Sequence, residues 1–70
     1  MKREKVKSSN VKSVGYDEIK KIMEVEFMSG DIYQYLNVPV EVFVAVVTAP
    51  SIGSAIHKML RNKYDFKKGN

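Results

Sequence analysis

The sequence predicts an α+β fold in which a three-stranded antiparallel β-meander is packed on one face by two α-helices. Three observations predict it. Residues 22–28 alternate between apolar and acidic side chains, which is typical of a half-buried strand. The turn sequence Ser29-Gly30-Asp31 follows and leads into another extended segment. Beyond Pro50, apolar residues recur at helical spacing, and the 70 residues together make one small domain.

The two ends of the chain are predicted to lie outside the folded part. Residues 1–9 are polar and charged without periodicity, so we expect a flexible basic N-terminal arm. Residues 10–66 form the single domain. Residues 67–70, with the sequence Lys-Lys-Gly-Asn, are expected to be a solvated tail.

The first strand is predicted over residues 11–17. Its sequence, Val-Lys-Ser-Val-Gly-Tyr-Asp, favours an extended backbone, and Asp17-Glu18 supply a turn. Gly15 weakens the pattern or marks either a bulge or the close approach of another backbone segment.

The second and third strands are predicted to form a β-hairpin, with the third strand over residues 32–38. A two-residue loop would mix apolar and polar residues on both faces. A three-residue loop instead places Phe27 opposite Tyr33 and Val25 opposite Tyr35, and directly opposed residues share a face. One face is then apolar and carries both tyrosines. The polar side chains of the other face are Glu24, Glu26 and Gln34.

Residues 40–47 are ambiguous when taken alone. The run is rich in β-branched valines, which favour a strand. Against this, Pro39 suits the first turn of a helix, and Glu41 would lie near the positive end of the helix dipole. A helix would bring one apolar stripe together, formed by Val40, Phe43, Val44 and Val47.

A second helix is predicted to follow Ser51, which is a suitable N-cap. The apolar residues at helical spacing behind it are Ile52, Ala55, Ile56, Met59 and Leu60. The basic residues of its last turns, where cations complement the helix dipole, are Lys58, Arg61 and Lys63. The predicted core of the whole domain consists of Val14, Tyr16, Met23, Val25, Phe27, Tyr33, Tyr35, Phe43, Val47, Ile56 and Leu60.

Composition indicates a soluble, cytoplasmic protein with no membrane partner. The chain has no cysteine, so neither a disulfide framework nor a thiolate metal site is expected. The N-terminus, Met-Lys-Arg-Glu-Lys, has no apolar run behind it and does not resemble a secretory signal. The longest apolar run, residues 42–47, is far shorter than the roughly 20 residues that cross a bilayer.

The charge of the chain is concentrated at its ends. Residues 1–12 and residues 58–70 each carry +4, whereas residues 13–57 carry −4. Basic ends around an acidic middle suggest affinity for a polyanion such as RNA. The alternative is that charged termini serve only to keep a small domain soluble.

Several short motifs follow one another in a fixed order along the chain. They are Ser8-Ser9-Asn10, Val14-Gly15-Tyr16-Asp17, Glu24-Val25-Glu26-Phe27, Ser29-Gly30, Tyr33-Gln34-Tyr35, Val38-Pro39, Ala49 with Ser51 and Gly53, and Arg61 with Tyr64. In this order they resemble the KTSC domain, which is named for the C-terminal domain of some lysyl-tRNA synthetases and also occurs as a small free-standing protein in bacteria and phages. The resemblance covers residues 8–66 and implies a helix over residues 39–49, a characteristic tyrosine pair, and RNA binding as the suggested function. Pro50 departs from the family pattern, which has an ordinary residue between the helices.

The tyrosine pair, Tyr33 and Tyr35, points to one side of an extended strand because side chains repeat every two residues. If that side were exposed, the rings would form a stacking platform for bases. If it were covered, the rings would pack under the helices with their hydroxyls at the rim. The predicted hairpin register favours the covered, structural role.

The better candidate for a nucleic-acid site is the C-terminal end, where cations alternate with aromatic side chains. The candidate residues are Lys58, Arg61, Lys63, Tyr64, Lys67 and Lys68, with Phe66 among them. The alternative is an ordinary helix end whose aromatic residues fold back onto the sheet.

No motif in the sequence indicates catalysis. His57 is the only histidine, and no phosphate-binding loop, metal-ligand spacing or nucleophile constellation accompanies it. We therefore expect no enzymatic activity, no cofactor and no metal.

The leading functional hypothesis is a small module that binds RNA or another nucleic acid through its basic C-terminal helix and tail. The alternative is a protein-interaction module, such as a phage or accessory factor, whose apolar patch would be formed by Ile32, Leu36 or the valines of the first helix. A homodimer through an edge strand or the first helix is compatible with either function.

Overall fold

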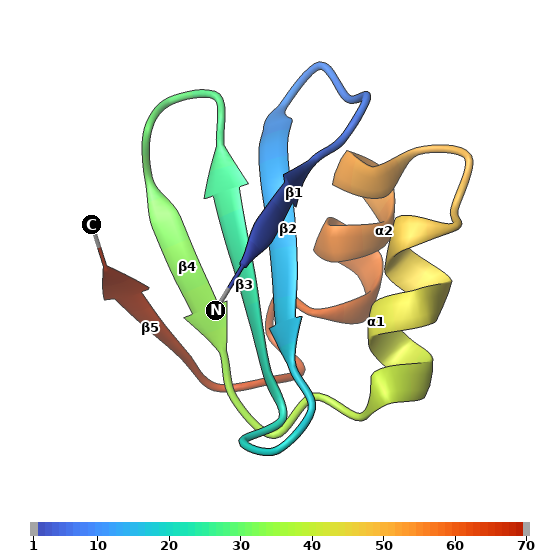
Figure 1. The fold of residues 1–70 in the computed structure, drawn as a ribbon. Coiled ribbons are helices and arrows are strands. Elements are labelled where there is room, and N and C mark those ends of the chain that lie inside the picture. Colours follow the sequence, from blue (N-terminus) through green and yellow to red (C-terminus); the bar gives the residue numbers. More distant parts are fainter. Residues whose placement is uncertain (1, 70) are drawn as a thin grey trace.

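A computed structural model describes residues 2–69, which form a five-stranded antiparallel sheet with two helices on one face (Figure 1). The strands are β1 (Arg3–Lys5), β2 (Val11–Asp17), β3 (Ile22–Phe27), β4 (Ile32–Tyr35) and β5 (Phe66–Gly69), and they lie in this order across the sheet. The helices, α1 (Val40–Val47) and α2 (Ile52–Met59), connect β4 to β5. The α+β class and the central meander are confirmed, whereas the prediction of three strands is wrong.

The two additional strands come from the ends of the chain, which the sequence predicts to be an arm and a tail. Residues 3–5 pair with β2, and residues 66–69 pair with β4. An isolated meander would expose unpaired backbone N–H and C=O groups along both edges, and these short segments pair with them. Met1 of the predicted arm and Asn70 of the predicted tail lie outside the described residues.

At Gly15 of β2, the start of the neighbouring strand β1 lies very close to the backbone. A Cβ atom on Gly15 would lie 2.6 Å from the carbonyl oxygen of Lys2, so only glycine leaves the space that β1 occupies. Because Gly15 has no side chain, the Arg3 guanidinium reaches across it and donates to Glu24 Oε1 at 2.6 Å. The predicted close approach is therefore confirmed, and the irregularity in the β2–β3 pairing lies elsewhere, between Val11 and Ser13.

The hairpin between β3 and β4 has the predicted three-residue loop, but it begins one residue earlier. The Phe27 N–H donates to the Asp31 carbonyl at 2.9 Å, and Gly30 takes a positive φ of 96° inside the loop. The predicted partners are wrong, because Val25 opposes Tyr33 and Met23 opposes Tyr35. The observed register of β3 and β4 is shifted from the predicted one by an even number of residues. The predicted separation into an apolar and a polar face is therefore retained.

Helix α1 presents a different face to the core from the predicted one. Val46 is fully buried, whereas Val40 and Val44 of the predicted stripe are 41% and 49% exposed. Phe43 and Val47 pack against the core but are only partly buried. Almost every position of this helix is apolar, so periodicity alone does not select the buried side.

Helix α2 begins at its predicted N-cap but ends at Met59, so Arg61 and Lys63, predicted in its last turns, follow the helix. The Ser51 Oγ accepts from the Ser54 N–H at 3.3 Å and caps the helix. Of the five predicted apolar positions, Met59 alone is only half-buried. The other four, Ile52, Ala55, Ile56 and Leu60, are buried.

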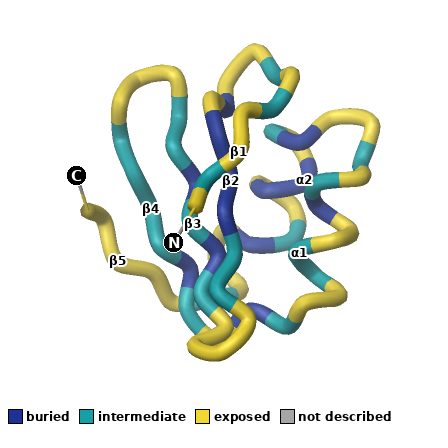
Figure 2. The backbone as a smooth tube through the Cα atoms, viewed as in Figure 1, coloured by how far each residue is buried: buried dark blue, intermediate teal, exposed yellow. Residues whose placement is uncertain are grey.

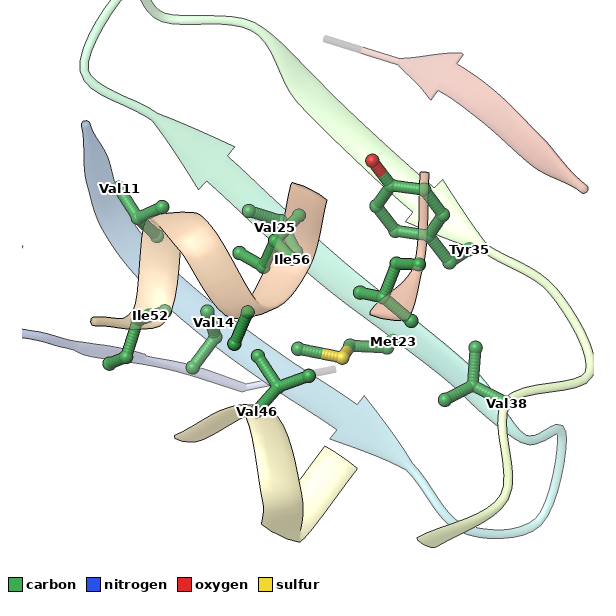
Figure 3. Packing of buried hydrophobic residues seen from close by; sticks show 11 residues of the cluster. Val11, Val14, Met23, Val25, Tyr35, Val38, Val46, Ile52 and Ile56 are labelled. Atoms are coloured by element: carbon green, nitrogen blue, oxygen red, sulfur yellow. The ribbon is translucent and has the colours of Figure 1, made fainter. Parts of the chain in front are cut away.

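The core lies between the helices and the centre of the sheet (Figure 3). Its buried apolar residues are Val11, Val14, Met23, Val25, Tyr35, Val38, Val46, Ile52, Ala55, Ile56 and Leu60. Five predicted core residues are instead only partly buried at its margin, namely Tyr16, Phe27, Tyr33, Phe43 and Val47. Two short helices cover only part of a five-stranded sheet, so the large rings at the edges remain partly open. Neither helix of residues 2–69 is long and apolar enough to cross a membrane.

Candidate nucleic-acid groove

The sheet extends beyond the helices on the side of β4 and β5. Helix α2 lies over β2 and β3 (Figure 3), and β5 is exposed along its whole length (Figure 2). A groove of about 870 Å³ lies between α2 and this part of the sheet. We call it the α2–β5 groove. Its sheet side is lined by Phe27, Met28, Ser29, Asp31, Tyr33, Tyr35 and Phe66, and its helix side by Gly53, Ser54, Ile56, His57, Lys58, Arg61 and Asn62, with Asn10 at one end.

A cluster of four aromatic rings forms the sheet side of the groove. Tyr33 and Phe66 stack with ring centroids 5.1 Å apart and planes 14° apart. Phe27 contacts Tyr33 edge-on at 5.5 Å, and Tyr35 lies 5.9 Å from Phe66. The cluster depends on β5, because its pairing with β4 sets Phe66 opposite Tyr35. Phe66 is 52% exposed, so one side of the stack is accessible to a ligand.

The two tyrosines of the pair have different environments. Tyr35 is only 4% exposed and belongs to the core, where Figure 3 shows its ring at the β4 side of the cluster. Burial raises the pKa of the Tyr35 phenol, the neighbouring Tyr33 raises it further, and the Arg61 cation acts in the opposite direction. Tyr33 is only half-buried and lines the groove. The structural role predicted for the pair therefore fits Tyr35, whereas Tyr33 is partly open to the groove.

Two basic side chains line the groove from the helix side. Lys58 comes from the last turn of α2, and Arg61 from the turn that follows it. Arg61 Nη1 lies 3.4 Å from Nδ1 of His57, one helical turn earlier. Both basic residues are exposed, and neither takes part in the ion pairs found within residues 2–69. Their charges are therefore available to an anionic ligand.

Of the six residues predicted to bind nucleic acid, three lie in or beside the groove. Lys58 and Arg61 line it. Lys68 lies beside it, because Lys68 opposes Tyr33 on the apolar face and its Nζ lies 3.5 Å from Asp31 Oδ1. Lys67 opposes Gln34 and so lies on the other face of the sheet.

The remaining two residues of the predicted set, Lys63 and Tyr64, follow α2 and do not line the groove. Lys63 is exposed, whereas Tyr64 packs against the core. The Tyr64 N–H donates to the Leu60 carbonyl at 3.2 Å, which holds this turn against the end of the helix.

Sequence reasoning missed the contribution of the β3–β4 hairpin to this site. Phe27 and Asp31 flank the hairpin loop, and both line the groove. The last residues carry a pattern that could have predicted β5. In a strand, Phe66 and Lys68 would lie on one face and Lys67 on the other. Among the residues that the structure describes, no cluster of three or more His, Asp or Glu side chains forms a metal site.

Comparisons with known proteins agree with this fold. Residues 7–64 match the KTSC domain family. The chain is 41% identical to an uncharacterized protein of Stutzerimonas stutzeri, across 91% of this chain and 90% of that protein. It is also 31% identical to a lysine–tRNA ligase of Trichormus variabilis across 91% of this chain, but the match spans only 11% of the ligase.

A solved structure has nearly the same fold. The crystal structure of a KTSC domain protein from Yersinia pestis superposes with a TM-score of 0.95, at 30% sequence identity, and the match covers 99% of this chain and 97% of that protein. Together with the match over residues 7–64, this shows that the chain belongs to the KTSC domain family.

Proposed function

We propose that this domain is a non-catalytic module that binds single-stranded RNA in the α2–β5 groove. The observation that carries the proposal is the stacked pair of Tyr33 and Phe66, open on one side and placed across the groove from Lys58 and Arg61. Proteins that bind single strands combine aromatic platforms for the bases with cationic side chains for the backbone.

In this proposal the sheet side of the groove receives the bases. The accessible side of Phe66 stacks on a base, and Tyr33 supports Phe66 from behind. Arg61 and Lys58 attract the phosphates from the helix side.

The opposite face of the sheet is a poor surface for RNA, which also supports the groove as the site. Its centre carries Glu24 and Glu26, and the cation beside them, Arg3, is already paired with these carboxylates. Glu24 also accepts a hydrogen bond from Gln34 at 2.8 Å. A phosphate at the centre of this face would meet two carboxylates beside a cation that is already paired, whereas Lys5 and Lys67 lie on the outer strands.

The relatives support RNA as the nucleic acid. Three of them are lysine–tRNA ligases, enzymes whose name states that they act on tRNA. The chain corresponds to only 11% of their length, so the ligase activity itself is not carried over. A domain joined to such an enzyme would be placed close to RNA.

Fluorescence anisotropy with labelled tRNA and labelled single-stranded RNA, at low and at high salt, tests the proposal. We expect binding that weakens steeply as salt increases, because phosphate contacts release counterions. Arg61→Gln should weaken binding and reduce the salt slope by about one. Lys67→Gln is the matched control, because it removes the same charge from the other face of the sheet. Absence of binding at both salt concentrations, or equal losses in the two variants, would contradict the proposal.

A second candidate function, protein interaction, is favoured by the exposed side of α1. Val40 and Val44 lie one turn apart, both are exposed, and neither lines the groove. Ile32 and Leu36, the other predicted patch residues, are partly buried. A partner that is retained after nuclease treatment and lost in Val44→Glu would favour this function. Binding that Val44→Glu leaves unchanged would exclude this surface.

A further inference from the structure

His57, the only histidine of the chain, lines the α2–β5 groove. It lies in the last turn of α2, with Lys58 next to it and Arg61 one helical turn further along. All three side chains are exposed, and all three line the groove. The helix side of the groove therefore presents two permanent cations and one side chain of a type whose charge depends on pH.

The contact between His57 and Arg61 requires a neutral imidazole. Arg61 Nη1 lies 3.4 Å from Nδ1 of His57. A guanidinium only donates hydrogen bonds, so Nδ1 takes part in this contact as an acceptor that carries no proton. Protonation of Nδ1 would turn the contact into a repulsion between two cations.

A phosphate in the groove reverses this preference. A phosphate bound by Arg61 replaces His57 as the acceptor for the guanidinium and places a negative charge beside the imidazole. A proton taken up from water at Nδ1 then gives the imidazolium a donor for a phosphate oxygen, in a charge-assisted hydrogen bond. His57 can therefore be a neutral partner of Arg61 in the free protein and a cation in the complex.

The other titratable side chains of the groove are of types that do not respond to pH in the same range. Those that face His57 from the sheet side are Asp31, Tyr33 and Tyr35. Lys68 stands beside them, with its Nζ 3.5 Å from Asp31 Oδ1. Carboxylates, phenols and ammonium groups do not ordinarily change charge between about pH 5.5 and pH 8, whereas an imidazole does. Any response of the groove to pH in this range would therefore arise from His57.

We infer that His57 takes up a proton as RNA enters the α2–β5 groove and becomes a third cation there, so that RNA binding strengthens as the pH falls. This inference rests on the proposed function, since it assigns a pH response to the same site. The complex holds one proton more than the free protein, so a lower pH favours the complex. One added hydrogen bond between charged groups raises the affinity about tenfold.

Fluorescence anisotropy with a labelled oligouridine that has no terminal phosphate tests the inference at about pH 5.5 and pH 8. Neither uridine nor a phosphodiester changes charge between these limits. We expect the wild type to bind about tenfold more tightly at the lower pH, with a salt slope that is steeper by about one. His57→Gln keeps an acceptor for Arg61 but cannot be protonated, so it should bind at both pH values as the wild type does at the higher one. His57→Lys, a permanent cation, should bind at both as the wild type does at the lower one.

Proton uptake can be followed directly by NMR, because the signals of the only histidine ring report its charge. By linkage, a tenfold coupling means that these signals titrate at a pH about one unit higher in the complex than in the free protein. A merely structural role of His57 would leave this midpoint unchanged.

Lys67→His in the His57→Gln background is the matched control, because it places an imidazole on the other face of the sheet and should not restore the pH dependence. Equal wild-type affinity at both pH values, or a pH dependence that survives in His57→Gln, would overturn the inference and leave RNA binding standing. If the oligomer binds at neither pH at low salt, the proposed function itself is wrong. A pH dependence that is lost in His57→Gln and not restored by the control would support the inference.

Discussion

Tyr33 and Phe66 stack with their ring planes 14° apart, although they come from distant parts of the chain. The contact exists because β5 returns after both helices and pairs with β4. The contact brings Tyr33 of the tyrosine pair together with Phe66, one of the two aromatic residues of the basic C-terminal end. The two sites that the sequence presents as alternatives are thereby parts of one groove.

Phe66→Leu should weaken the binding of single-stranded RNA about tenfold, because stacking of a base on an aromatic ring contributes roughly 1–3 kcal/mol. The same change should lower the free energy of unfolding by less than about 1.5 kcal/mol, since the ring is half exposed and mainly loses its aromatic contacts. Anisotropy titration and urea unfolding measure the two effects.

Phe43→Leu is the matched control for this prediction. Phe43 stacks on Tyr16 with centroids 4.9 Å apart, and neither residue lines the groove. This variant should lose stability and keep its affinity for RNA. Equal affinity losses in Phe43→Leu and Phe66→Leu would show that a general loss of stability, and not stacking, is responsible.

Gly15→Ala should displace β1 from the sheet. The new methyl group would lie 2.6 Å from the Lys2 carbonyl oxygen, which forces the backbone to shift, and 3.1 Å from Cγ of Arg3, which is a tight contact. We expect a loss of about 1–3 kcal/mol in the free energy of unfolding, as for other overpacked positions. Amide hydrogen exchange should show that β1 loses its protection.

A double-mutant cycle shows whether this loss arises through β1. If Gly15→Ala already releases the strand, adding Arg3→Ala should cost nothing further, because the contact between Arg3 and Glu24 is already broken. Additive losses in the two variants would mean that β1 stays in place and that the strain is absorbed elsewhere.

The parts of the fold that the sequence predicts well are those with a readable period. Residues 11–17 and 22–27 form strands close to their predicted bounds, and α2 begins at its predicted N-cap, Ser51. The short edge strands are not readable in this way. Residues 3–5 are all charged, and β5 is a strand because an unpaired edge of β4 is available to it.

The site is predictable in composition but not in arrangement. Lys58 and Arg61 are recognisable from the sequence as cations near aromatic residues. The placement of Lys68 beside the groove and of Lys67 on the other face of the sheet depends on the β4–β5 register, which is set by long-range pairing. Asp31 is likewise not recognisable from the sequence as a residue that lines the groove, since the sequence identifies it only as part of a turn.

Val46→Ala should lower the free energy of unfolding by about 2 kcal/mol, because it removes two methyl groups from a fully buried site and leaves a cavity. Val44→Ala, on the exposed side of the same helix, should change it by less than about 0.5 kcal/mol. Urea unfolding of both variants tests whether α1 buries Val46, as in the structure, or Val44, as in the predicted stripe. A larger loss of stability in Val44→Ala than in Val46→Ala would contradict the structure.

The stability of the domain should fall in alkaline solution, and Tyr35 should be one cause. Burial raises the pKa of its phenol above the ordinary value of 10.0, so the unfolded chain loses this proton first as the pH rises. The stabilising effect is therefore fully present below about pH 10 and is lost as the pH rises through the folded-state pKa. Urea unfolding from pH 8 to pH 11, in about half-unit steps, should show a shallower decline for Tyr35→Phe than for the wild type.

Tyr16 provides an internal comparison for this pH dependence. Burial and the nearby Glu41 raise the pKa of its phenol as well, so Tyr16→Phe should remove a separate part of the alkaline decline. Its hydroxyl also donates to the Val38 carbonyl at 2.5 Å, and this variant should therefore be less stable than the wild type at neutral pH too. Tyr35→Phe breaks no hydrogen bond of this kind within residues 2–69 and should be nearly as stable as the wild type at pH 7. If Tyr35→Phe declined with pH as steeply as the wild type, the contribution assigned to Tyr35 would be wrong.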